Sequence, residues 1–139
     1  STTDENNTLP TFALQDNVDV TVDQTVVNNS SYSVKVVDQT GTNRPDLRFN
    51  ISNLADIGST YTVSIDVREE LAEEWSVILQ DFLGWQNTVT QLIESQGAWK
   101  TVTLTGVASR STIGVRISTP VTHTEGVTLY YDNITITKL

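Results

Sequence analysis

Apolar and polar residues alternate with a period of two along almost the whole chain. The clearest case is 61–68, where Tyr61, Val63, Ile65 and Val67 share one parity. Such residues lie on one face of a strand, so this pattern predicts half-buried β-strands. Further strands are predicted at 18–27, 32–37, 46–51, 76–82, 88–94, 100–107, 112–118 and 127–137, with turn signals between them. Helix-forming composition occurs only at 69–74, which is too short for a helix and is predicted to be a loop or a single turn.

Short strands at regular spacing, without a strong helix, predict an all-β fold. We expect an antiparallel β-sandwich of the jelly-roll type, with two packed sheets and a concave ligand face. A length of 139 residues suits one domain. We place this domain at 11–139 and expect 1–10 to be a terminal or linker segment.

The composition excludes several classes of function. A formal net charge of -9 argues against a nucleic-acid partner and against an anionic membrane surface, because both need a basic footprint. No apolar run is long enough to span a membrane. Cys is absent, which excludes disulfides and thiolate metal sites. Many Thr and Ser with no Met are typical of an exported β domain, so we expect a secreted protein.

The last predicted strand contains an interruption at Asp132-Asn133. Acidic residues are poor strand formers, and no Gly or Pro ends the run here. A β-bulge that directs the Asp132 carboxylate at a cation would explain the interruption. The alternative is a solvent-facing Asp at a strand kink.

Four stretches, in this order, resemble the β-jelly-roll carbohydrate-binding modules of families 4, 9, 16 and 22. The first is a strand after a polar turn, at 30–37, and the second is a turn followed by an aromatic residue and a long strand, at 58–68. The third is a Gly-x-Trp strand entry at 97–102, and the fourth is the final Tyr-Tyr-Asp-Asn at 130–134. The resemblance covers about 30–139. It implies a glycan lying across one sheet and a structural Ca²⁺ near the chain ends, with Asp132 as a ligand.

The outward parity of the strands selects candidate glycan-binding residues. If the resemblance holds, one open face carries Arg48, Asp66, Arg68, Gln80, Arg116 and Ser118, with Arg44 and Asp46 beside it. Family members that bind neutral β-glucans or xylans commonly have an aromatic residue where this chain has Arg44-Pro45. Arginine pairs with carboxylates in a bidentate manner, so these arginines favour an anionic, uronate-containing glycan. The alternative is that Asp46 and Asp66 neutralise the arginines on an ordinary solvated face.

Trp85 is the candidate for stacking on a sugar ring, because it lies in a polar, glycine-flanked stretch. The alternative for Trp85 is a hydrophobic plug. Trp75 shares the parity of core residues and favours a core or rim position, while Trp99 fits a structural role. Tyr130 faces the other way from the core tyrosines and is a candidate surface residue.

Nothing in the sequence indicates catalysis, so we do not expect an enzyme. Glycoside hydrolysis needs two carboxylates across a groove, whereas the acids here fall in 69–74, expected to be a solvated loop, or on isolated strands. The one histidine, His123, is expected to be solvated, and no Gly-x-Ser-x-Gly elbow accompanies it.

The sequence therefore predicts a noncatalytic polysaccharide-binding module. It would target a secreted carbohydrate-active enzyme to a plant or algal cell-wall glycan, binding a polysaccharide or oligosaccharide as a monomer tethered to a catalytic domain. Three alternatives stay open: a structural or adhesion β-sandwich without a glycan groove, a binder of neutral β-glucan or xylan, and a small jelly-roll lyase or hydrolase.

Overall fold

The chain forms an all-β structure. The structure is a computed structural model, and it describes residues 2–4, 12–13, 18–28, 33–41, 46–52, 54–70, 75–81, 86–92, 97–120 and 122–139. These residues contain no helix, and hence none long and apolar enough to cross a membrane. The strands are β1 (Thr2–Asp4), β2 (Phe12–Ala13), β3 (Val18–Asp23), β4 (Ser33–Asp38), β5 (Asp46–Ser52), β6 (Thr60–Glu69), β7 (Ser76–Asp81), β8 (Gln86–Leu92), β9 (Lys100–Val107), β10 (Ile113–Ser118) and β11 (Thr128–Lys138).

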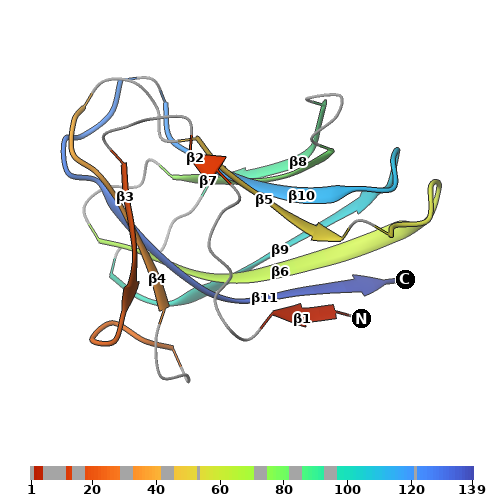
Figure 1. Ribbon diagram of the computed structural model, residues 1–139, viewed down its shortest axis with the longest axis horizontal. Helices are drawn as coiled ribbons and strands as arrows, with labels where there is room; N and C mark the ends of the chain where they lie inside the picture. The colour runs from red at the N-terminus through yellow and green to blue at the C-terminus, as the bar shows by residue number, and fades with distance from the viewer. Residues whose placement is uncertain are drawn as a thin grey trace.

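The strands form two antiparallel sheets packed as two layers (Figure 1). Sheet A has the order β3-β4-β11-β6-β9, with β1 also pairing with β11, and sheet B has the order β2-β5-β10-β7-β8. From β4 onward the chain passes back and forth between the sheets, except that β7 and β8 are neighbours in sheet B, and this strand order is that of a jelly roll. The predicted fold class is therefore confirmed.

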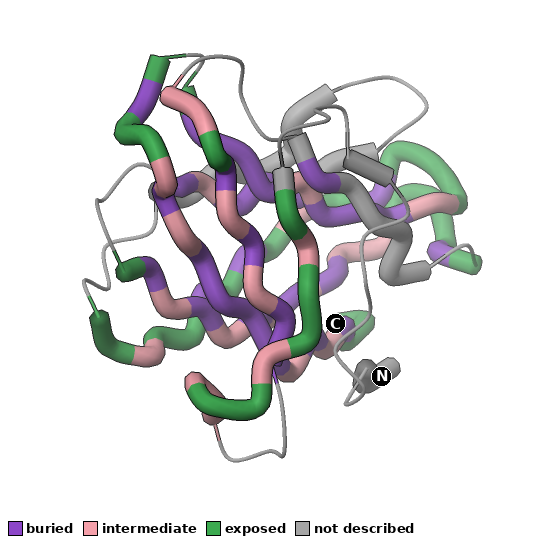
Figure 2. Tube along the Cα trace, turned by 60° about the vertical axis from the view of Figure 1, so that its left-hand side comes forward, coloured by how far each residue is buried: buried purple, intermediate pink, exposed green. Residues whose placement is uncertain are grey.

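The core lies between the two sheets, and the period of two in the sequence determines which side chains enter it. In β6, Tyr61, Val63, Ile65 and Val67 are buried, while the residues between them are partly exposed. Figure 2 shows the same alternation of buried and partly exposed segments along the strands. Inward-facing residues of β4, β7, β9, β10 and β11 complete the core.

All nine predicted strands are present, although their ends differ. The largest difference is at β3, which ends at Asp23 and not at Val27. Asp23 Oδ1 accepts hydrogen bonds from the backbone N–H groups of Thr25 and Val26, each 2.8 Å long. Both bonds lower the pKa of the Asp23 carboxyl, and the bond from Val26 has the larger effect. The resulting turn ends the strand.

The two shortest strands were not predicted. β1 pairs with β11, with Thr2 opposite Ile136 and Asp4 opposite Ile134. Residues 2–4 of the terminal segment therefore pair with sheet A. β2 pairs with β5 at the edge of sheet B. Strands of two or three residues are too short to show a periodic pattern.

The predicted bulge in the last strand is confirmed. The register of β11 against β6 shifts between Asp132 and Thr135. Asn133 has a φ of 52°, a left-handed conformation that asparagine tolerates better than most residues. Asn133 N donates a hydrogen bond of 2.7 Å to Asp132 Oδ1, which holds this conformation. Asp132 is fully buried, so the alternative of a solvent-facing carboxylate is wrong.

Candidate functional site

The outer face of sheet B brings together most of the predicted glycan-binding positions. Antiparallel partners point to the same side of a sheet, so the register defines rows across β5, β10 and β7. In one row Arg48 is opposite Arg116, which is opposite Ile78. In the row on one side Asp46 is opposite Ser118, and in the row on the other side Gly114 lies between Asn50 and Gln80.

Arg48 and Arg116 are direct partners on neighbouring strands. Guanidinium groups hydrogen-bond carboxylates in a bidentate manner, so two arginines at adjacent positions on one face suit an anionic ligand. Arg116 is partly exposed. The side chains of Asp46, Arg48, Asn50, Gln80 and Asn87 lie outside the described part of the structure, so these residues are placed by the register of their strands.

The row beyond the arginines contains planar amides. Asn50 is opposite Gly114, Gly114 is opposite Gln80, and Gln80 is opposite Asn87 of β8. Amide groups suit paired sugar hydroxyls, because each offers a donor and an acceptor in one plane. Outward parity in the sequence predicted Gln80 on this face but not Asn87. The alternation in β8 is weak, and only the register against β7 places Asn87 on this face.

Two residues on this face are more buried than predicted. Ser118 is 5% exposed and Ile78 is 7% exposed, although their parity directs them away from the core. The prediction that Ser118 contacts a ligand on an open surface is therefore wrong. Ile78 also lies outside the hydrophobic core cluster, as its parity requires. Outward parity places a residue on the outer side of a sheet, but it does not make that residue accessible.

Asp66 and Arg68 lie on the other sheet, so the prediction of one shared face is wrong for these two residues. Both belong to β6, which pairs with β11 and β9 in sheet A. Alternation distinguishes inward from outward positions. It does not show which of two sheets a strand joins, and hence to which side of the molecule an outward residue points.

Asp66 is the centre of a hydrogen-bond network in sheet A. Its Oδ2 accepts from Asn28 Nδ2 at 2.9 Å and from Asn133 Nδ2 at 3.0 Å, and its Oδ1 accepts from Thr101 Oγ1 at 2.5 Å. The network joins β6, β9, the β11 bulge and the turn after β3. A carboxylate with these three donors has a structural role, so Asp66 is removed from the candidate glycan site.

Asp66→Ala should therefore reduce stability and leave glycan binding unchanged. Losing hydrogen bonds to a charged, partly buried acceptor should lower the free energy of unfolding by about 2 kcal/mol. Urea denaturation measures this change, with Asp56→Ala as the matched control because Asp56 is exposed. A loss of binding to a glycan without a loss of stability would return Asp66 to the site.

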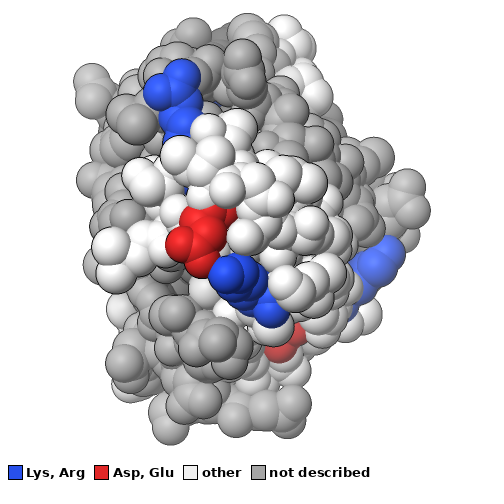
Figure 3. Space-filling view, turned by 90° about the vertical axis from the view of Figure 1, so that its right-hand side faces the viewer, with Lys and Arg blue, Asp and Glu red and all other residues white. Residues whose placement is uncertain are grey.

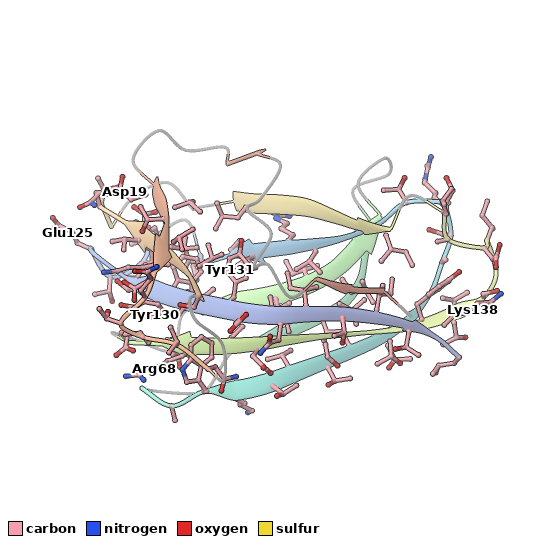
Figure 4. All side chains as sticks on the ribbon, turned by 60° about the horizontal axis from the view of Figure 1, so that its bottom comes forward. Asp19, Arg68, Glu125, Tyr130, Tyr131 and Lys138 are labelled. Carbon is pink, nitrogen blue, oxygen red and sulfur yellow. The ribbon has the colours of Figure 1, made fainter. Side chains whose placement is uncertain are left out.

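Arg68 lies beside aromatic and charged neighbours on the outer side of sheet A. Its direct partner on β11 is Tyr130, and its Nε pairs with Glu70 Oε1. Figure 4 shows Tyr130 and Arg68 close to each other at one end of the sheet. The Nζ of Lys35, which is opposite Tyr130 on β4, lies 5.7 Å from the centre of the Tyr130 ring. Tyr130 faces outward as expected, but at 6% exposure it is not a surface residue.

The tryptophans differ in what the structure shows of them. Trp75 is fully buried just before β7, in agreement with the core alternative. Trp99 is partly exposed and lies directly before β9. Trp85 and Arg44 lie outside the described residues, so their roles in glycan binding stay predictions.

Calcium binding at Asp132 is a prediction from the sequence. Ca²⁺ takes six to eight oxygen ligands, which include backbone and amide oxygens as well as carboxylates. In the described ranges, no three His, Asp or Glu side chains gather into a group that could hold a metal. Asp132 lies opposite Asp66, whose two oxygens already accept the hydrogen bonds of the network. Asp132 as a calcium ligand therefore stays a prediction.

Two ionisable residues expected in solvent are buried. His123 is 7% exposed, and Glu69 is fully buried as the last residue of β6. The predictions of a solvated histidine and a solvated Glu69 are therefore wrong. Glu69 follows the inward parity of Ile65 and Val67, and this was the sequence signal that could have placed it. The side chain of His123 has no exposed surface, so it cannot reach a substrate.

The end of the molecule that carries the C-terminus has mixed charge. Lys138 Nζ donates a hydrogen bond of 2.6 Å to Asp56 Oδ2, and this bond raises the pKa of Lys138. Figure 3 shows this end, where a few basic and acidic groups lie among the uncharged described residues. Among the described residues, therefore, this end forms no broad patch of one sign.

Comparison with solved structures places the fold among carbohydrate-binding modules. One match is the CBM22-1 and GH10 modules of endo-1,4-β-D-xylanase 10B from Clostridium thermocellum, complexed with xylohexaose; the TM-score is 0.70 at 18% identity, over 99% of this chain and 28% of that one. A CBM4 structure matches with a TM-score of 0.67 at 14% identity, over 88% of this chain and 92% of that one. The enzymatically active domain of tailspike protein 4 from bacteriophage CBA120 matches with a TM-score of 0.69 at 14% identity, over 98% of this chain and 20% of that one.

The chain spans about a quarter of the length of the xylanase that it matches. No protein-family model matches the sequence, and no curated protein matches it. At these identities the similarity shows the fold. The chain is thus a β-jelly roll that resembles the carbohydrate-binding modules of families 4 and 22.

Proposed function

We propose that this domain is a noncatalytic module that binds a polysaccharide on the outer face of sheet B. The observation that carries the proposal is the direct pairing of Arg48 with Arg116 on two central strands. The adjacent row of Asn50, Gln80 and Asn87 adds amide groups suited to sugar hydroxyls. The resemblance to carbohydrate-binding modules supports the same function.

The arginine pair favours an anionic, uronate-containing glycan of plant or algal cell walls. A uronate carboxylate over Arg48 and Arg116 could accept bidentate hydrogen bonds from a guanidinium group. Such a module would act as the secreted, monomeric targeting domain of a carbohydrate-active enzyme. By holding that enzyme on an extended glycan, it would raise the local substrate concentration.

Arg116→Ala should weaken binding to an acidic polysaccharide by about 10- to 100-fold, because a hydrogen bond to a charged group contributes about 1.5–3 kcal/mol. Affinity electrophoresis of the protein in gels containing polygalacturonate, alginate, xylan or β-glucan measures the effect. Arg68→Ala is the matched control, because it removes the same side chain from the opposite sheet. It should leave the retardation unchanged.

Three outcomes would contradict parts of this proposal. Retardation that is lost in Arg68→Ala and kept in Arg116→Ala would move the site to sheet A. Salt-insensitive binding to xylan or β-glucan alone would replace the anionic glycan with a neutral one, because exposed charge pairs are screened by salt. Wild-type protein that no gel retards would favour a structural or adhesion domain.

Trp85→Ala belongs in the same gels, and we expect it to weaken binding through the loss of ring stacking.

We also propose that Asp132 binds Ca²⁺ together with residues outside the described ranges. Adding Ca²⁺ after chelation should then raise the melting temperature of the wild type, because a ligand of the native state stabilises it by mass action. The melting temperature of Asp132→Asn should respond much less. A wild-type melting curve that chelation does not change would remove the calcium site.

A further inference from the structure

At the end of the molecule opposite the C-terminus, the side chains of His123 and Asp38 join the β10–β11 connection to the start of the β4–β5 connection. His123 Nε2 lies 3.0 Å from Asp38 Oδ2, and neither side chain has any exposed surface. Asp38 ends β4, and His123 lies in the connection from β10 to β11. Figure 4 shows Glu125 of this connection far from Lys138 at the other end of β11. We call the His123–Asp38 pair and the backbone bonds around it the latch.

Backbone hydrogen bonds join the same two connections. His123 N donates to Gly41 O at 3.0 Å, Gly126 N donates to Asp38 O at 2.8 Å, and Asp38 N donates to Val127 O at 3.1 Å. The backbones approach so closely that a Cβ at Gly41 would lie 2.6 Å from His123 O. A side chain at Gly41 would therefore displace one connection from the other.

The latch lies between the chain segments that enter and leave the proposed binding face. The connection from β4 leads to Asp46, the first residue of β5. The connection that contains His123 begins after Ser118, the last residue of β10. Asp46 and Ser118 are direct partners in sheet B, two positions from the Arg48–Arg116 pair. Holding the two connections together therefore fixes these strand ends beside the arginines.

The polar groups around the His123 ring indicate where the ring carries a hydrogen. Nδ1 lies 2.9 Å from the carbonyl oxygen of Pro120, which can only accept, so Nδ1 carries a hydrogen. Asp38 Oδ1 accepts hydrogen bonds from the N–H and hydroxyl of Thr40. Its other oxygen, Oδ2, lies 3.0 Å from Nε2, a close contact of two buried polar atoms that does not have the geometry of a hydrogen bond. Charged residues on the adjoining described segments include Glu125, which is exposed, Asp19 on β3, which accepts from Gln39 Nε2, Lys35 on β4 and the buried Glu69 on β6.

We propose that His123 is a positioning residue for the sheet B face, holding β5 and β10 in register through the contact of its buried ring with the Asp38 carboxylate and the backbone hydrogen bonds beside it. Burying two polar side chains together is costly, and its use here is to fix one arrangement of two connections. The effect of the latch on glycan binding rests on the function proposed above. Its effect on the positions of β5 and β10 does not depend on that function.

Amide hydrogen exchange of the intact domain tests this proposal without a glycan. In His123→Gln, amide exchange at 46–48 and 116–118 should accelerate about tenfold or more, with at most about a twofold change at 101–106 in β9. Thr122→Ala is the matched control, because Thr122 is the exposed neighbour of His123 and should change neither region.

A second variant keeps the test decisive if His123→Gln does not fold. Gly41→Ala leaves the pair intact and displaces its connection, so it should accelerate exchange in the same two strand ends. Exchange that rises evenly over all strands, or that does not change, would overturn the latch.

Measurements of glycan affinity test the effect of the latch on binding separately from its effect on strand position. In gels containing the polysaccharide that retards the wild type, His123→Gln should weaken binding at least about threefold, as expected for local opening beside the site. Unchanged affinity in a variant with accelerated exchange at 46–48 would overturn the positioning role. If no gel retards the wild type, the proposed function fails, while the exchange pattern still decides whether the latch holds the strands.

Discussion

Asp38→Ala should lower the free energy of unfolding by about 3–5 kcal/mol, because it leaves the buried His123 ring without its partner. This is a large part of the 5–15 kcal/mol or so that stabilises a typical domain. The substitution also removes the acceptor for the backbone N–H of Thr40, which adds to the loss. Urea denaturation measures the change.

Asp19→Ala is the matched control for Asp38→Ala. Asp19 is an exposed carboxylate on the neighbouring strand β3, and its hydrogen bond joins two exposed side chains. Its removal should cost less than about 1 kcal/mol. If Asp38→Ala cost as little as Asp19→Ala, the pair would not hold the two connections together.

Trp75→Ala should also cost about 3–5 kcal/mol, because it leaves a large cavity in the core. Trp75 is fully buried and belongs to the core cluster that both sheets build. Urea denaturation again measures the loss. Trp99→Ala is the comparison, and its loss should be smaller because Trp99 keeps part of its surface in solvent.

The Trp75 result also distinguishes core packing from sugar stacking. If Trp75→Ala abolished glycan binding while its urea midpoint stayed at the wild-type value, Trp75 would be a stacking residue and its burial would be wrong. We expect the opposite, a lower midpoint and unchanged affinity in the fraction of the protein that remains folded.

The strands were predictable because one physical rule determines them. Residues on one face of a strand are buried against the other sheet, so the period of two appears directly in the sequence, as in β6 and β10. The bulge at Asp132 was predictable for a related reason, since an Asp-Asn pair inside a strong strand needs an irregular backbone.

The assignment of residues to one binding face could not be predicted from alternation. Arg68 and Arg116 both have outward parity, yet β6 and β10 belong to different sheets. Strand pairing depends on contacts between segments far apart in the chain, and a single strand carries no signal of its neighbours. Only the register shows that Arg48 and Arg116 are partners and that Arg68 lies elsewhere.

The buried ionisable residues were missed although a signal was present. Asp38 continues the inward parity of Val34 and Val36, and Glu69 continues that of Ile65 and Val67. The acidic composition suggested that these carboxylates lie in solvent, whereas the parity of their strands placed them on the inner side. For His123 no such signal exists, because it lies in a connection without periodicity, and its burial depends on the approach of Gly41.

The most direct measurement is a map of amide chemical-shift changes on addition of oligogalacturonate to the isotope-labelled domain. We expect the changes to cluster at 46–52, 76–80 and 114–118, in the three adjacent strands β5, β7 and β10 of sheet B. Changes that cluster at 62–68 and 101–105 in sheet A, with none in β5 and β10, would contradict the proposed binding face.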